Sequence, residues 1–194
     1  MRLLMVAPPG AGKGTQATRL AAYYGIAHLS SGDLFRKEVA AGSDIGIEAA
    51  GYLARGDLVP DRLVIEMLGP HVIEATLQGG YVLDGFPRTL PQAEEAYRVA
   101  QEVSEIELQA VVHLEVSRAE LLRRLLARAT ADGRLDDTET VIRHRLDVYD
   151  KETAPMLEFY AGRGLVVDID GEQPVEDVFS AIIGSVDAVR AGLR

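Results

Sequence analysis

A lysine within a glycine-rich loop is the first residue of this sequence that could do chemistry. The loop, residues 7–15, directly follows an apolar run and directly precedes a segment with helical spacing. In that context glycines let backbone N–H groups converge on phosphate oxygens, the helix N-terminus adds a favourable dipole, and the lysine neutralises phosphate charge. The loop therefore predicts a site for the phosphates of a nucleoside triphosphate, formed by Gly10, Ala11, Gly12, Lys13, Gly14 and Thr15.

The loop departs from the pattern G-x-x-x-x-G-K-[ST] at two positions. Ala7 stands where the first glycine is expected, and Gly14 separates Lys13 from Thr15. The form Gly-Lys-Gly-Thr resembles the loop of nucleoside monophosphate kinases, so the second departure narrows the prediction. The methyl group of Ala7 could alter the geometry at the entrance of the loop.

Two alternatives exist for this loop. A dinucleotide-binding fingerprint is the main one, because Gly10 and Gly12 supply G-x-G and Asp33 lies about 20 residues further on. However, Thr15 replaces the third glycine, and Lys13 suits a terminal triphosphate better than an internal pyrophosphate. The other alternative is a glycine-rich turn without a ligand, which the strand-loop-helix context disfavours.

An acid and several arginines form the second set of candidates. Asp84 ends an apolar run, so its carboxylate is expected at the sheet edge beside the phosphate loop, where it can hold a water molecule of a Mg²⁺ ion. Asp33 is a second candidate for this role. Arginine offers a planar fork that grips two phosphate oxygens and stays charged at any useful pH. Arg88 stands at a strand exit, and Arg124 and Arg128 share one helix face.

Composition restricts the partners. With 30 acidic and 20 basic residues the formal charge is −10, whereas nucleic acids and anionic membranes require a broad basic face. We therefore expect neither partner, and any phosphate site must be a local basic pocket. The chain has no cysteine, which excludes a Cys-ligated zinc site, and no apolar stretch approaches ~18 residues, so we expect a cytoplasmic protein. The histidines lack a spacing that suggests a metal site and are interpreted as structural or surface residues: His28, His71, His113 and His144.

The elements that must position these residues alternate between two patterns. Short apolar runs that predict buried strands occupy residues 3–7, 27–29, 81–83, 110–116 and 165–169. Helical spacing occupies residues 13–24, 34–41, 45–55, 61–77, 91–103, 119–128, 137–160 and 175–189. Strands alternating with helices predict a layered α/β fold with a parallel five-stranded sheet. Together with the loop's resemblance to that of nucleoside monophosphate kinases, this implies a three-layer arrangement with helices on both faces of the sheet, of the P-loop kinase type.

Two stretches do not fit a simple alternation. Residues 30–78 hold several helical patterns where one would suffice, and residues 128–137 are polar and contain glycine. Both are candidate mobile flaps at the strand ends, where open α/β sheets bind ligands. We expect one domain over residues 1–194, with an inserted monophosphate-binding segment, 30–59, and a short lid, 128–137.

Four further segments carry a resemblance to a known family. They are residues 30–36, 58–60, 84–88 with Gln92, and 134–137 with Arg145. Together with the phosphate loop they resemble the bacterial adenylate kinases over nearly the whole chain. The resemblance implies reversible transfer from Mg²⁺-ATP to AMP giving two ADP, by direct in-line displacement, with Mg²⁺ as cofactor, ATP and AMP or ADP as substrates, and a monomer.

The resemblance also implies roles for individual residues. Catalytic roles fall to Lys13, Arg88, Arg124, Arg128, Arg134 and Arg145. AMP contacts fall to Ser31, Arg36, Asp57, Leu58, Val59, Gly85, Phe86, Pro87, Arg88, Gln92, Arg134 and Arg145. ATP would contact Arg128 and Gly171 in addition to the phosphate loop, and Asp84 and Asp33 would hold Mg²⁺ through water.

Two features differ from the usual family pattern. Ser31 stands where the family usually has threonine, so discrimination between acceptors could be looser, and the lid is short and lacks zinc ligands. Another nucleoside monophosphate kinase, such as one acting on UMP or CMP, is the nearest alternative. A nucleotide-sensing module that binds without turnover is an alternative from a different class.

Overall fold

The five predicted strands form one sheet. The computed structural model describes residues 1–102, 107–132 and 138–192. All strand pairs are parallel and the order is β2-β3-β1-β4-β5, which confirms the predicted parallel α/β fold. The strands are β1 (Arg2–Val6), β2 (Ala27–Ser30), β3 (Tyr81–Asp84), β4 (Ala110–Glu115) and β5 (Val166–Asp170).

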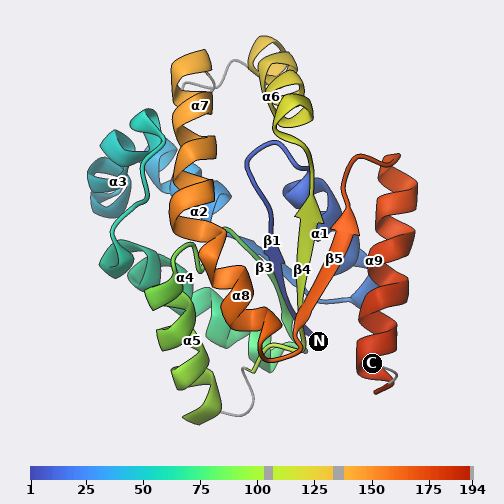
Figure 1. The fold of residues 1–194 in the computed structure, drawn as a ribbon. Helices are drawn as coiled ribbons and strands as arrows, with labels where there is room; N and C mark the ends of the chain where they lie inside the picture. Colours follow the sequence, from blue (N-terminus) through green and yellow to red (C-terminus); the bar gives the residue numbers. More distant parts are fainter. Residues whose placement is uncertain (103–106, 133–137, 193–194) are drawn as a thin grey trace.

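Helices cover both faces of this sheet (Figure 1). Leu3 and Met5 of β1 belong to one hydrophobic cluster, while Leu4 and Val6 belong to another, because alternate side chains of a strand point to opposite faces. The first cluster includes residues of α1 and α9, and the second includes residues of α4 and α8. The helices described are α1 (Lys13–Tyr24), α2 (Ser31–Ala41), α3 (Asp44–Arg55), α4 (Asp61–Leu77), α5 (Leu90–Glu102), α6 (Arg118–Asp132), α7 (Glu139–Val148), α8 (Pro155–Ala161) and α9 (Val175–Arg190).

The single helix predicted over residues 137–160 is wrong. Within the described residues, α7 and α8 are joined by a π-helical turn, η2 (Tyr149–Thr153). Pro155 has no N–H and its ring clashes with the carbonyl group four residues earlier, so an undistorted α-helix cannot continue through it. The backbone widens instead, and the N–H of Ala154 bonds to the carbonyl oxygen of Tyr149 at 2.9 Å.

Helix α6 is longer than predicted. It was expected to end at residue 128, but it continues to Asp132, through the first residues of the polar run. Alanine, which occurs at 129 and 131, has the highest helix propensity and supports this extension. The rest of the predicted lid, residues 133–137 with Arg134, lies outside the described residues.

The topology gathers loops at one end of the sheet. From β1 the chain passes to β2 at one edge of the sheet, whereas from β4 it passes to β5 at the opposite edge. The direction in which successive strands are added therefore reverses at β1. Ligands of open α/β sheets bind beside the carboxyl ends of the strands at such a point. Helices α6 and α7 rise beyond these strand ends (Figure 1). In the described part of the chain, no helix has the length and apolar character needed to cross a membrane.

Candidate active site

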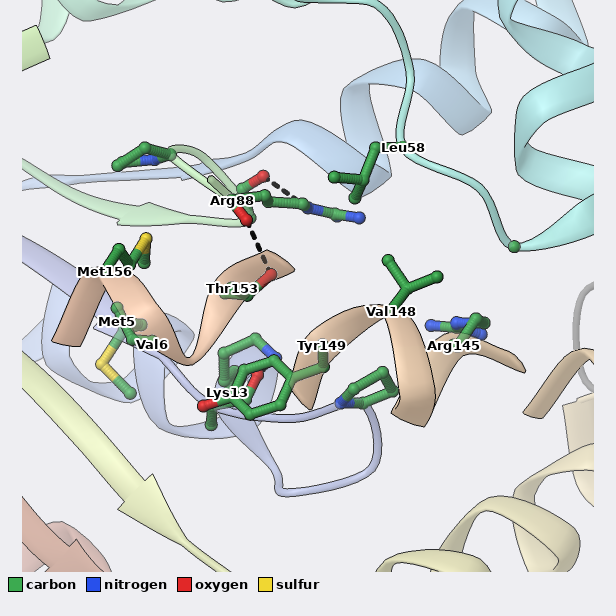
Figure 2. A pocket seen from close by; sticks show the side chains of 15 residues that line it. Met5, Val6, Lys13, Leu58, Arg88, Arg145, Val148, Tyr149, Thr153 and Met156 are labelled. Atoms are coloured by element: carbon green, nitrogen blue, oxygen red, sulfur yellow. Dashed lines mark hydrogen bonds between the residues drawn. The ribbon is translucent and has the colours of Figure 1, made fainter. Parts of the chain in front are cut away.

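The carboxyl ends of the central strands open into two adjoining cavities. The larger has a volume of about 380 Å³ and the smaller about 100 Å³. Figure 2 shows Lys13, Arg88 and Arg145 around the smaller cavity, from three different parts of the chain. The larger cavity brings together most of the predicted phosphate and metal ligands: Gly10, Gly12, Lys13, Gly14, Thr15, Asp33, Arg36, Asp84, Gly85, Arg88, Arg124, Arg128 and Arg145.

Two glycines shape the phosphate loop. Gly10 and Gly12 have φ angles of +86° and +96°, in the left-handed region that favours glycine. A Cβ atom at Gly10 would lie 2.7 Å from Cγ of Leu125, so the loop backbone packs closely against α6. The loop therefore needs glycine where its backbone turns and where α6 approaches it.

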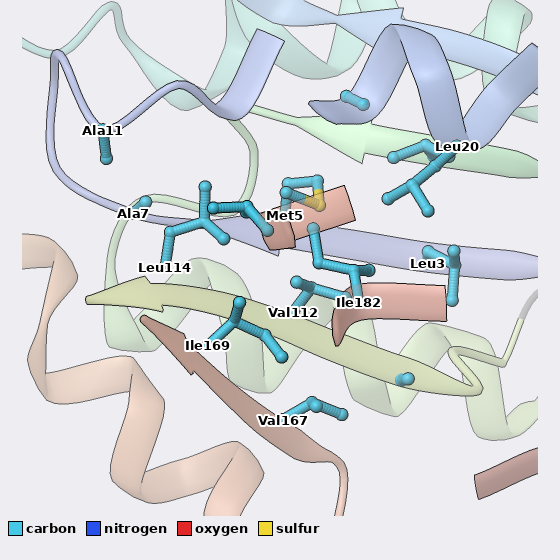
Figure 3. Close-up of a cluster of buried hydrophobic side chains, with 14 of the residues drawn as sticks. Leu3, Met5, Ala7, Ala11, Leu20, Val112, Leu114, Val167, Ile169 and Ile182 are labelled. Carbon is cyan, nitrogen blue, oxygen red and sulfur yellow. The ribbon is translucent and has the colours of Figure 1, made fainter. Parts of the chain in front are cut away.

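Ala7 does not require such a conformation. No described residue other than glycine has a positive φ angle. The Ala7 side chain is 4% exposed and, like Ala11, belongs to the hydrophobic cluster beneath the loop (Figure 3). Its methyl group therefore packs into the core without demanding a strained backbone.

Lys13 is held over the loop and strongly destabilised as a cation. Its Nζ donates to the carbonyl oxygen of Ala7 at 2.5 Å and to that of Pro8 at 3.3 Å. Burial lowers the pKa of Lys13 to about 8; Asp84 opposes this, while Arg88 and other arginines lower the pKa further. The site thus holds more positive charge than its acids compensate.

Arg88 is fixed by three hydrogen bonds. Its Nε donates to the carbonyl oxygen of Gly85 at 2.7 Å, its backbone N–H donates to Oε1 of Gln92 at 2.7 Å, and its carbonyl oxygen accepts from Oγ1 of Thr153 at 2.8 Å. Figure 2 shows the bonds to Gly85 and Thr153. Burial lowers the pKa of the guanidinium, and Asp84 opposes this. The orientation of the side chain is therefore set before any ligand arrives.

A narrow pocket beside Arg88 gathers several of the predicted AMP ligands. It is lined by Ser31, Leu58, Val59, Phe86 and Gln92, among others. The hydroxyl of Ser31 is buried and donates to the carbonyl oxygen of Gly85 at 2.8 Å. The pocket combines apolar walls with a polar amide, in a volume of about 20 Å³.

Gln92 is held at both ends of its amide. Its Oε1 accepts from the Arg88 backbone, and its Nε2 donates to the carboxylate of Asp61. The peptide bond between Phe86 and Pro87 is cis. These contacts join the start of α4 to the loop after β3.

The oxygen-bearing side chains at the edge of the larger cavity fit the coordination of a magnesium ion. Asp84 is 9% exposed at the end of β3, and Asp33 and Thr15 line the same cavity. Mg²⁺ prefers oxygen ligands and retains several waters, so carboxylates reached through water and a nearby hydroxyl suit it. Asp33 also forms an ion pair with Arg36, which keeps the pKa of Asp33 below its usual value although burial acts to raise it.

Arg124 and Gly171 lie together at the edge of the larger cavity, and Asp57 stands between two residues that line the smaller one. Arg124 donates to Oε1 of Glu120 at 2.7 Å and to the carbonyl oxygen of Gly171 at 3.0 Å, so two predicted residues contact each other. Asp57 accepts from Arg55 and His144, each at 2.8 Å. The position of Arg134 is not described.

Several residues that line the smaller cavity were not singled out from the sequence, among them three from one segment. Tyr149, Thr153 and Met156 line the smaller cavity from the η2–α8 segment. They follow one another at intervals of four and three residues, so the sequence signal resembles an ordinary buried helix face. The polar member of that face, Thr153, was the available clue.

Comparisons with known proteins agree with this geometry. The family model for adenylate kinase matches residues 5–165. The adenylate kinase of Micrococcus luteus is 43% identical over 190 residues, covering 98% of this chain and 92% of that protein. The adenylate kinase of Kocuria rhizophila is 44% identical, covering 96% and 98%. That of Parasynechococcus marenigrum is 47% identical, covering 93% and 96%.

Proposed function

The chain belongs to the adenylate kinase family and is therefore a nucleoside monophosphate kinase, and from this premise we propose that it catalyses ATP + AMP = 2 ADP, reversibly and with Mg²⁺. The observation that carries the proposal is the convergence of Lys13, Arg88 and Arg145 on adjoining cavities in a chain of net charge −10. Such a local basic site fits a polyphosphate.

The donor side is formed by the phosphate loop. In the proposal Gly10, Ala11, Gly12, Lys13, Gly14 and Thr15 bind the ATP phosphates, with Arg128 and Gly171 as further ATP contacts. The left-handed glycines and the N-terminus of α1 support this assignment, because together they aim backbone N–H groups at an anion.

The acceptor side is formed by the pocket beside Arg88. The proposed AMP ligands are Ser31, Arg36, Asp57, Leu58, Val59, Gly85, Phe86, Pro87, Arg88, Gln92, Arg134 and Arg145. The fixed guanidinium of Arg88, which lines both the large cavity and the base pocket, supports a place for the AMP phosphate between them.

The proposed chemistry needs no protein nucleophile. An oxygen of the AMP phosphate attacks the γ-phosphorus of ATP while the bond from that phosphorus to the β-γ bridging oxygen breaks, which leaves two ADP molecules. The attacking oxygen is already anionic, so a strong general base is unnecessary. The protein supplies alignment and charge, through Lys13, Arg88, Arg124, Arg128, Arg134 and Arg145.

Magnesium is the proposed cofactor. Asp84 and Asp33 would hold it through water, and when bound it would neutralise and orient the ATP phosphates. We further propose a monomeric, cytoplasmic enzyme without nucleic-acid or membrane partners, in which segment 30–59 binds the monophosphate and the short lid 128–137 excludes water.

The direct test is ADP formation from Mg-ATP with AMP, UMP, CMP or GMP as acceptor, with and without EDTA. We expect turnover with AMP to exceed that with the other acceptors and to stop without Mg²⁺. Higher turnover with UMP or CMP would overturn the acceptor assignment. Tight ATP binding without ADP production would favour a sensing module instead.

A further inference from the structure

A continuous buried face runs through α7, η2 and α8. Its members are spaced by four, three, four, three and four residues, and each is 9% exposed or less: Ile142, Leu146, Tyr149, Thr153, Met156 and Tyr160. Five of them are large aliphatic, sulfur-containing or aromatic side chains. Thr153 is the exception, a small polar residue in a position where packing alone favours an apolar one.

The hydroxyl of Thr153 has one specific partner. Oγ1 donates to the carbonyl oxygen of Arg88 at 2.8 Å. Within the described residues, Thr153 is the only protein group that donates a hydrogen bond to the carbonyl oxygen of Arg88. Valine has the same shape and would fill the buried face equally well, but it would leave this carbonyl group without its donor.

The bond joins two segments that both supply phosphate ligands. Arg145 precedes Thr153 on the same α7–η2 segment, and Arg88 lies on the loop after β3. All three residues line the smaller cavity (Figure 2). The π-helical turn ends at Thr153, so the distortion that Pro155 imposes lies where this hydroxyl meets Arg88.

We propose that Thr153 is a positioning residue, which fixes the backbone of Arg88 and thereby the placement of its guanidinium relative to Arg145. The side chain of Arg88 is held by Gly85 of the same loop, and its backbone N–H is held by Gln92 in the first turn of α5. Thr153 supplies the tie to the segment that carries the second arginine. This inference rests on the proposed function, because it assumes that Arg88 holds the acceptor phosphate.

The test compares three variants of the full chain. Thr153→Val removes the hydroxyl and keeps the shape, whereas Thr153→Ser keeps the hydroxyl and loses the methyl group. Thr76→Val is the matched control, because Oγ1 of Thr76 donates to the carbonyl oxygen of Val72 at 2.7 Å on α4, in a helix turn that lines none of the described cavities. Each variant is measured for kcat, for KM of AMP and ATP separately, for AMP binding by calorimetry and for Tm.

For Thr153→Val we expect kcat/KM for AMP and the AMP affinity to fall about five- to tenfold, the effect of losing one buried hydrogen bond. The KM for ATP should stay within about twofold, and Thr153→Ser should recover most of the loss. Thr76→Val should leave all kinetic values unchanged.

Wild-type AMP affinity in Thr153→Val, or equal losses in Thr153→Ser and Thr153→Val, would overturn the positioning role. A parallel loss of AMP and ATP affinity would also overturn it, since that pattern follows from general destabilisation. Absence of ADP formation by the unmodified protein would contradict the proposed function, and the calorimetric comparison would still decide the role of Thr153.

Discussion

Replacing Lys13 with methionine is expected to stabilise the ligand-free protein while removing most of its turnover. Burial lowers the pKa of Lys13 from 10.5 to about 8, against the effect of Asp84. At pH 7 this difference lowers the free energy of unfolding by about 3 kcal/mol. Methionine also forfeits the two bonds from Nζ to the carbonyl groups of Ala7 and Pro8, a loss of about 1 to 2 kcal/mol. The remaining gain of about 1 to 2 kcal/mol corresponds to about 2 to 8 °C in Tm.

The dependence of this gain on pH identifies its cause. Between pH 8 and 10.5 the unfolded chain retains the Lys13 proton that the folded chain has released, so the unfolded state binds more protons and wild-type stability rises with pH. Below pH 8 both states are protonated and the full cost is present. The stability advantage of Lys13→Met should therefore be largest at pH 7 and shrink toward pH 10.

The assay is denaturant unfolding of ligand-free protein at pH 7, 8, 9 and 10, with ADP formation measured in parallel. Lys151→Met is the control, because Lys151 is 83% exposed and should show no such convergence. We expect Lys13→Met to lose about 10²- to 10³-fold in kcat, as when one donor to a transition-state charge is removed. A variant less stable than wild type at pH 7, or a difference independent of pH, would refute the reasoning.

Three further predictions concern the rest of the site. Arg88→Lys should lower kcat/KM for AMP about 100-fold, because the ammonium group of lysine cannot replace the fixed bidentate fork of arginine. Arg163→Lys, at an exposed position, is the control. Equal activity of the two variants would contradict the acceptor assignment. Asp84→Asn should raise the Mg²⁺ concentration that gives half-maximal turnover about tenfold or more, and an unchanged Mg²⁺ titration would remove Asp84 from the metal site. Gly10→Ala should lower the free energy of unfolding by about 1 to 3 kcal/mol more than Gly164→Ala. Both glycines have positive φ angles, but of the two only Gly10 lacks room for a Cβ atom. Equal denaturation midpoints for these two variants would contradict the packing argument.

The sequence predicted the sheet and the phosphate loop because both depend on local patterns. A strand buried on both faces is apolar throughout, as residues 3–6 of β1 are, and its neighbours β3 and β4 are apolar and buried over residues 81–83 and 110–112. Helix α1 begins at Lys13 and ends at Tyr24 as predicted, because the glycine loop and Gly25 bound it on both sides. Asp84 and Arg88 line the larger cavity, as expected, because a strand end and a Pro-Arg turn restrict their positions.

The sequence could not reveal contacts between segments far apart in the chain. The bonds from Gln92 to Asp61 and from Arg124 to Gly171 depend on how α4, α5, α6 and the loop after β5 pack. The π-helical turn was missed for a different reason: intervals of four and three residues fit a straight helix equally well, and only Pro155 indicated a distortion.

The charge of the site and the charge of the whole chain have opposite signs, and this affects how a nucleotide can be recognised. A net charge of −10 repels an anionic nucleotide at long range. At physiological salt, however, this repulsion is screened beyond about 8 Å. Recognition must therefore come from groups in direct contact with the phosphates. Burial, which lowers the pKa of Lys13 and of Arg88 in the ligand-free protein, also lowers the local polarity and so strengthens the attraction of both cations for a bound phosphate. In the proposed function the same residues reduce stability without the ligand and would hold the bound phosphates most strongly, so nucleotide binding should stabilise the wild type more than Lys13→Met.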